Sequence, residues 1–149
     1  NLHQLWRRIV FNIAISNTDD HLRNHGFILN EKGWELSPAY DLNPSIEKDG
    51  LSLNIDMDDN ALDFELAKSV GEFFRLSENE MDIILDEVIN VVKDWKSVAK
   101  GIGIKKSEID LMNGAFNIKK IISVRLKNQD RFAVSPEISG KNKDLIVTN

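Results

Sequence analysis

The segment from Ser77 to Ala99 constrains the fold most, because its apolar residues recur with the period of an α-helix. Ser77 and Glu80 match a capping box, in which each side chain bonds the other residue's main-chain N–H at a helix start. The following apolar positions share one helical face: Met81, Ile84, Leu85, Val88, Val92, Trp95 and Ala99. Such a face is stable only when it is buried. We therefore predict one helix of about six turns, packed in a core and ended by Gly101-Ile102-Gly103.

The beginning of the chain has the same periodicity. A helix is predicted from residue 2 to about Ser16, and Asn12 is expected to point away from its apolar stripe. That stripe consists of Leu2, Leu5, Trp6, Ile9, Val10 and Ile13. Trp6 and Trp34 are expected to join Trp95 in one core, because large aromatic side chains are usually buried.

Further helices are predicted downstream. Asn60 is a suitable cap for a helix that runs to about Arg75, with Phe73 on its apolar side. Ser107 is expected to cap a short helix through Met112, and apolar residues at 118–122 indicate one more. Between the first helix and residue 60 the sequence instead indicates β-structure. Residues 26–29 and 34–37 are predicted to pair through a four-residue turn whose last residue, Gly33, is placed for a positive φ. A further short strand is predicted at Leu51–Ile55.

The composition excludes several classes of protein. The chain has 149 residues, of which 42% are hydrophobic, enough for a single domain with its own core. No apolar run is long enough to cross a membrane and the first residues lack a signal peptide, so a cytoplasmic protein is expected. The absence of Cys excludes disulfides and thiolate zinc sites. The net charge of -5 argues against a broad surface for direct nucleic-acid binding.

The chemistry is expected in the irregular segments. Residues 17–24 form a polar octet between the first helix and the hairpin, and Asp41 lies in an irregular stretch after the hairpin. Asp19 and Asn24 fit the pattern Asp-x-x-x-x-Asn of a kinase catalytic loop. Phosphoryl transfer needs a carboxylate for the proton of the attacking hydroxyl and oxygen ligands for Mg²⁺. A hairpin between the two segments would return the chain, so that Asp41 can lie beside Asn24.

These residues carry a family resemblance. Asn-Thr-Asp-Asp-His-Leu-Arg-Asn at 17–24, followed by Leu-Ser-Pro-Ala-Tyr-Asp-Leu at 36–42, resembles the C-terminal part of HipA-like serine/threonine kinases. Those kinases are toxins of bacterial toxin–antitoxin systems. The resemblance implies Asp19 as the catalytic proton acceptor and Asn24 and Asp41 as Mg²⁺ ligands. It also implies contacts with ATP from His21, Leu22, Arg23, Asn24, Tyr40 and Asp41.

The resemblance also implies an architecture and partners. The chain would be one mainly α domain with a small β-hairpin, the C-terminal helical lobe of a protein-kinase-like fold. Its parts would be a catalytic loop at 17–24, a metal-binding segment at 38–45, a helical bundle at about 60–127 and a polar tail at about 128–149. The expected partners are a protein substrate, in this family often a translation factor, and a small DNA-binding antitoxin.

One departure from the kinase pattern is informative. Kinases place a glycine-rich phosphate-covering loop and a phosphate-binding lysine before the catalytic loop. Only 18 residues precede Asp19 here, and they contain no such loop. We therefore expect the chain to work as part of a longer kinase whose N-terminal lobe it lacks, and to be poorly active alone.

Two other functions remain open from the sequence. The first alternative is a non-catalytic module that binds an antitoxin-like partner. A metal-dependent hydrolase is the second alternative, because His21 and His25 have the spacing of zinc ligands on a helix, with Asp19 as a third ligand. Asp20 fits the base position less well than Asp19, since it breaks the spacing to Asn24.

Overall fold

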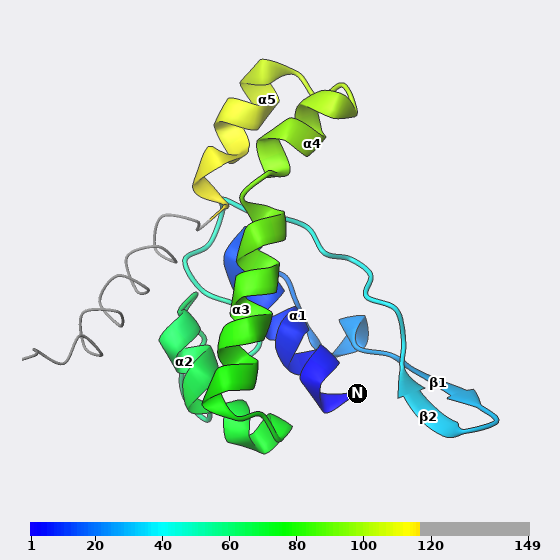
Figure 1. Cartoon of the computed structure of the whole chain (residues 1–149). Coiled ribbons are helices and arrows are strands. Elements are labelled where there is room, and N and C mark those ends of the chain that lie inside the picture. The colour runs from blue at the N-terminus through cyan, green and yellow to red at the C-terminus, as the bar shows by residue number, and fades with distance from the viewer. Residues whose placement is uncertain (117–149) are drawn as a thin grey trace, which may run out of the picture.

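The computed structural model describes residues 1–116, which form helices and one small antiparallel sheet, as expected for an α+β fold (Figure 1). The helices are α1 (Leu2–Ile15), α2 (Phe64–Ser69), α3 (Glu78–Val92), α4 (Trp95–Gly101) and α5 (Lys106–Leu111). The strands are β1 (Phe27–Asn30) and β2 (Gly33–Leu36), and the 3-10 turns are η1 (Leu22–Asn24), η2 (Gly71–Phe74) and η3 (Met112–Gly114). The helix predicted at 118–122 and the polar tail lie outside the described residues. None of the described helices has the length and apolar character needed to cross a membrane.

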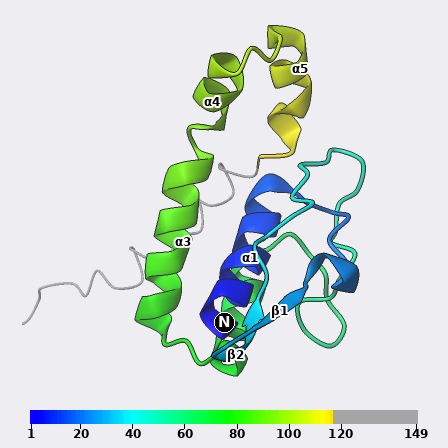
Figure 2. The ribbon, with the colours of Figure 1, turned by 90° about the vertical axis from the view of Figure 1, so that its right-hand side faces the viewer.

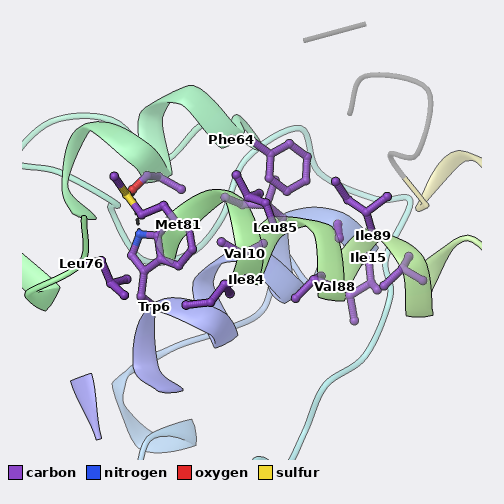
Figure 3. Close-up of a cluster of buried hydrophobic side chains, with 14 of the residues drawn as sticks. Trp6, Val10, Ile15, Phe64, Leu76, Met81, Ile84, Leu85, Val88 and Ile89 are labelled. Carbon is purple, nitrogen blue, oxygen red and sulfur yellow. Dashed lines mark hydrogen bonds between the residues drawn. The ribbon is translucent and has the colours of Figure 1, made fainter. Parts of the chain in front are cut away.

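The core lies where α1 packs against α3 and α2. Trp6, Val10 and Ile13 of α1 are fully buried, as the predicted stripe requires. Leu5 and Ile9 of that stripe are partly buried, whereas Leu2 at the helix start is exposed, so the stripe was predicted one residue too long. The α3 side chains in this core are Met81, Ile84, Leu85, Val88, Ile89 and Val92. Figure 3 shows the two sets facing each other, with Phe64 beside them. The predicted capping box at Ser77 and Glu80 is present and begins α3.

Trp6 also ties α1 to α2. Its indole Nε1 donates a hydrogen bond to the Ala67 carbonyl, with 2.8 Å between the two atoms. The prediction that Trp34 belongs to the same core is wrong. Trp34 is 66% exposed, because the hairpin projects away from the helices (Figure 1).

The single long helix predicted from 77 to 99 is wrong. The chain turns at Lys93 and Asp94, so α4 is a separate helix at the end of α3 (Figure 2). The buried core cluster extends along α3 only to Val92. Trp95 instead stacks on Phe116, with ring centroids 3.9 Å apart.

The middle of the chain also differs from expectation. Asp63, rather than Asn60, caps α2, because its side chain accepts a hydrogen bond from the Glu65 N–H. Asn60 instead donates its side-chain amide to the Leu51 carbonyl. The strand expected at 51–55 is absent from the described fold, where a single bridge joins Gly50 and Ala61.

Two other predicted positions are corrected. Phe73 lies in η2 and is 74% exposed, so it does not belong to the core. Ser107 lies inside α5, which begins at Lys106, and the Lys105 N–H donates to the Glu108 carboxylate at this helix start.

The hairpin forms where predicted, with a tighter turn. Phe27 pairs with Leu36 and Asn30 pairs with Gly33, which leaves two residues in the connection instead of four. Gly33 has the positive φ that the sequence predicted, at 112°. The Leu36 N–H donates a hydrogen bond to the Asn1 side-chain oxygen, so β2 lies beside the start of α1.

Candidate functional site

The polar octet starts where α1 ends. Ser16 adopts the left-handed conformation, with φ of 51°, and the Asn17 N–H donates to the Asn12 carbonyl at 2.8 Å. This C-terminal cap satisfies a carbonyl of the last helical turn and turns the chain sharply. Asn17 and Thr18 are each 1% exposed as a result. The octet is therefore a loop that includes η1 and whose first two residues are buried, in spite of their polar side chains.

Side chains from α1 organise this loop. The Asn12 Nδ2 donates to the Asp20 carboxylate at 2.7 Å, and its Oδ1 accepts from the Asn17 Nδ2 at 3.1 Å. Asn12 is 1% exposed, so the expectation that it points away from the buried face is wrong. Its burial is possible because both ends of its amide are bonded within the loop.

The two adjacent aspartates have opposite environments. Asp20 is 7% exposed and accepts hydrogen bonds from Asn12 and from the His25 Nε2, the latter at 3.0 Å. Asp19 is exposed. A base must reach its substrate, and of the two carboxylates only that of Asp19 is open to one.

The second predicted segment lies against this loop. The Asn17 Nδ2 also donates to the Asp41 carbonyl at 3.3 Å. The Tyr40 hydroxyl donates to the Arg23 carbonyl at 2.5 Å. The Ser45 N–H donates to the Ser16 carbonyl at 3.1 Å. These contacts join residues 16–23 to residues 40–45, on either side of the hairpin.

Asp41 has an unusual backbone conformation. Its φ is 56°, in the left-handed region that residues other than Gly seldom occupy. Its side chain is exposed, and its Oδ1 accepts a hydrogen bond from the Asn43 Nδ2 at 2.7 Å. Such outliers cluster at functional sites, where the surrounding structure holds them in place.

Several buried polar atoms of the loop have no hydrogen-bond partner among the described residues. They are Asn17 Oδ1, His21 Nδ1, Asn24 Nδ2 and His25 Nδ1. Asn24 is only 6% exposed, whereas its neighbours Leu22 and Arg23 are exposed. An unpaired buried polar atom costs about 1–3 kcal/mol. A cluster of such atoms is a place where a ligand or bound water can supply the missing bonds.

The donor groups decide which metal fits. No group of three or more His, Cys, Asp or Glu side chains in residues 1–116 is arranged to hold a metal ion. The zinc site predicted from His21, His25 and Asp19 is thus not formed, and His25 bonds Asp20 instead. Asn24 and Asp41 offer an amide and a carboxylate, hard donors that suit Mg²⁺, which usually takes few protein ligands and completes its shell with phosphate and water. The unpaired atom of buried Asn24 is its Nδ2, a hydrogen-bond donor that suits a phosphate oxygen, so a metal ion would be held by the side-chain oxygen Oδ1 instead.

A separate groove of about 970 Å³ lies between α1, the hairpin and α3. Its lining is largely apolar, with Phe11 and Val88 among its walls, and none of the predicted site residues lines it. Arg8 borders it and donates to the Ser37 carbonyl.

Sequence reasoning missed how three residues hold the loop: Asn12 of α1, Asp20 within the loop and His25 directly after it. A weak signal existed, since Asp20 and His25 lie beside the residues predicted for the site and an Asn in the last turn of an apolar helix needs a partner. Only the folded path of the chain identifies that partner.

Comparison with protein families gives one finding. Residues 1–95 match the family described as HipA-like C-terminal domain, a range that includes both site segments and all of α3. Comparison with curated proteins and with solved structures gave no match.

Proposed function

Because the chain belongs to the HipA-like C-terminal domain family, we propose that it is the catalytic lobe of a serine/threonine protein kinase. The reaction is transfer of the ATP γ-phosphoryl group to a Ser or Thr hydroxyl of a protein. The helical body with its hairpin would be the C-terminal lobe of a protein-kinase-like fold.

In this proposal Asp19 orients the attacking hydroxyl and accepts its proton. Asn24 and Asp41 hold Mg²⁺, which when bound neutralises charge on the nucleotide phosphates. His21, Leu22, Arg23 and Tyr40 flank the nucleotide. Catalysis of phosphoryl transfer depends mainly on positioning and electrostatics, so a loop fixed by buried hydrogen bonds suits the task.

The observation that carries the proposal is the packing of the two segments against each other. The bonds from Asn17 to the Asp41 carbonyl and from Tyr40 to the Arg23 carbonyl hold the base segment beside the metal segment. Chemistry at one phosphate requires both segments together, and they are separated in sequence by the hairpin. The exposure of Asp19 beside a bonded, buried Asp20 supports the choice of base.

The family resemblance extends the proposal to partners. The N-terminal lobe that covers the phosphates would come from residues outside this chain. The protein would be the toxin of a toxin–antitoxin system, bound by a small DNA-binding antitoxin and acting on a protein substrate such as a translation factor. A cytoplasmic location follows from that role.

One observation favours a second candidate, a non-catalytic module that binds an antitoxin-like partner. Phe27, Leu29 and Trp34 on the hairpin are 58%, 63% and 66% exposed. The register places Leu29 opposite Trp34, so these side chains form an apolar surface. A partner that covers this surface would explain the exposure without any catalysis.

Phosphoryl transfer separates the two candidates. The full-length protein that contains this chain is incubated with γ-labelled ATP and Mg²⁺, and label on protein is measured for wild type, Asp19→Asn and Asp110→Asn. Asp110 is an exposed aspartate on α5 and serves as the matched control. The kinase proposal predicts a loss of about 100-fold or more in Asp19→Asn only. Equal labelling by all three proteins would remove Asp19 as the base, and no labelling by wild type would favour the binding module.

A further inference from the structure

A buried cluster outside the proposed catalytic residues closes the loop. Asp20 accepts hydrogen bonds from Asn12 at 2.7 Å and from His25 at 3.0 Å, both on its Oδ2. We call these three residues the Asp20 clamp. It connects α1 to the first residue after Asp19 and to the first residue after Asn24. The proposed base and the proposed metal ligand therefore each lie directly before a clamp residue in the sequence.

The clamp takes the place of main-chain hydrogen bonds, which residues 19–21 of the loop do not donate within the described part of the chain. Among the described residues, the N–H groups of Asp19, Asp20 and His21 donate no hydrogen bond to the main chain. The second half is better ordered, since the Asn24 N–H donates to the His21 carbonyl at 2.8 Å. The bonds of the Asp20 side chain thus anchor residues 19–21, whose own N–H groups make no main-chain bond within residues 1–116.

Burial fixes the direction in which the Asp20 side chain points. A carboxylate is withdrawn from water only when hydrogen bonds replace its hydration, and here an amide and an imidazole do so. The side chains of Asp20 and His25 in the clamp are only 10% and 13% exposed. With Asp20 fixed inward on α1, the adjacent Asp19 is held at the surface.

We propose that the Asp20 clamp is a positioning device, which holds Asp19 and Asn24 in the arrangement that phosphoryl transfer requires. The inference rests on the proposed function. The clamp residues themselves touch neither ATP nor the hydroxyl. Residues that orient a metal ligand without touching the metal typically contribute about 10–100-fold to affinity or activity.

His25 is the residue to change. Asp20→Ala would strip the acceptor from two buried donors and endanger folding, whereas His25 lies at the edge of the cluster. The variants are His25→Ala, which opens the clamp, and His25→Gln, which keeps a side-chain N–H donor. His3→Ala is the matched control, because His3 is exposed and bonds only the Arg75 carbonyl among the described residues.

Two measurements are made on the full-length protein. Hydrogen–deuterium exchange of the peptide covering residues 17–25 reports loop order, with the α3 peptide as an internal reference. Steady-state kinetics give kcat and the KM for ATP. We expect His25→Ala to raise exchange in the loop only and to lower kcat about 10–100-fold, with a smaller change in KM. His25→Gln should restore most of both, and His3→Ala should change neither.

Contrary outcomes are distinct. Unchanged loop exchange in His25→Ala would overturn the clamp, and faster exchange with full kcat would overturn its positioning role. If wild type transfers no phosphate, the proposed function has failed, and the exchange data alone then decide whether the clamp orders the loop.

Discussion

The Asn17 side-chain amide donates a hydrogen bond to the Asp41 carbonyl, with 3.3 Å between the two atoms, although the hairpin separates the two residues in the sequence. The same Nδ2 donates to Asn12 of α1 at 3.1 Å. One buried amide therefore links the first helix, the polar loop and the segment that carries Asp41.

Replacing this amide is expected to loosen all three parts. Asn17→Ala removes the donor to the Oδ1 of buried Asn12 and to the Asp41 carbonyl. We expect the free energy of unfolding to fall by about 1–3 kcal/mol, as measured by urea denaturation of the chain. The control Asn79→Ala changes an exposed residue of α3 and should shift it by about 0.5 kcal/mol or less. Equal shifts in the two variants would contradict the link.

The three tryptophans give a second prediction. Trp6→Phe removes the donor to the Ala67 carbonyl. Because Trp6 is fully buried, the smaller ring also leaves a cavity in the core. The expected loss of stability is about 2–4 kcal/mol. Trp34→Phe changes an exposed position and should cost about 0.5 kcal/mol or less. A large loss from Trp34→Phe would mean that the hairpin packs on the core after all.

Gly71 provides a test of packing between η2 and α3. A Cβ at this position would lie 2.0 Å from the Met81 sulfur, so Gly71→Ala forces a buried side chain to move. We expect a loss of about 1–3 kcal/mol in thermal or urea unfolding. The double variant with Met81→Ala should lose less than the two single changes added together, because the clash is then gone.

Gly101→Ala is the control for Gly71→Ala. Nothing lies within 4 Å of an added Cβ at Gly101, which ends α4. The change should be neutral or stabilise by up to about 1 kcal/mol. If both alanines were equally harmless, the contact between Gly71 and Met81 would not be tight.

The capping box of α3 predicts a pH effect. Hydrogen bonds from the Ser77 side chain and then from the Ser77 N–H lower the pKa of Glu80 below its ordinary value of 4.5. Because the folded chain binds this proton less readily than the unfolded chain, the stabilisation is present above that ordinary value and is lost as the pH falls through the lowered pKa. Ser77→Ala should return the pKa of Glu80 toward 4.5 in an NMR titration and flatten the pH dependence of unfolding in the acid range. A pKa of Glu80 that does not move in Ser77→Ala would refute this cause.

Local patterns explain what could be predicted. The stripe on α1, the capping box at Ser77 and the positive φ of Gly33 follow from nearby residues alone, and the structure contains all three. The site segments were predicted from their chemistry and spacing. Their mutual packing is observed, while their roles in catalysis stay predictions.

Tertiary context explains the rest. Trp95 and Ala99 keep the helical spacing of α3, but the core that would hold one long helix ends at Val92. Trp34 is apolar enough for a core, yet its strand lies on a hairpin that projects from the helices. The burial of Asn12 depends on where the chain turns after Ser16, and no periodicity encodes that path.

The central claim is that the loop and Asp41 together bind Mg²⁺ and ATP. Its most direct test is calorimetry of ATP binding to the full-length protein, with and without Mg²⁺, for wild type, Asp41→Asn and the control Asp110→Asn. Asparagine tolerates the left-handed conformation of Asp41 and removes only its charge. The account predicts Mg²⁺-dependent binding that weakens about 10-fold or more in Asp41→Asn alone. Binding that is absent in wild type, or equally tight in all three proteins, would contradict it.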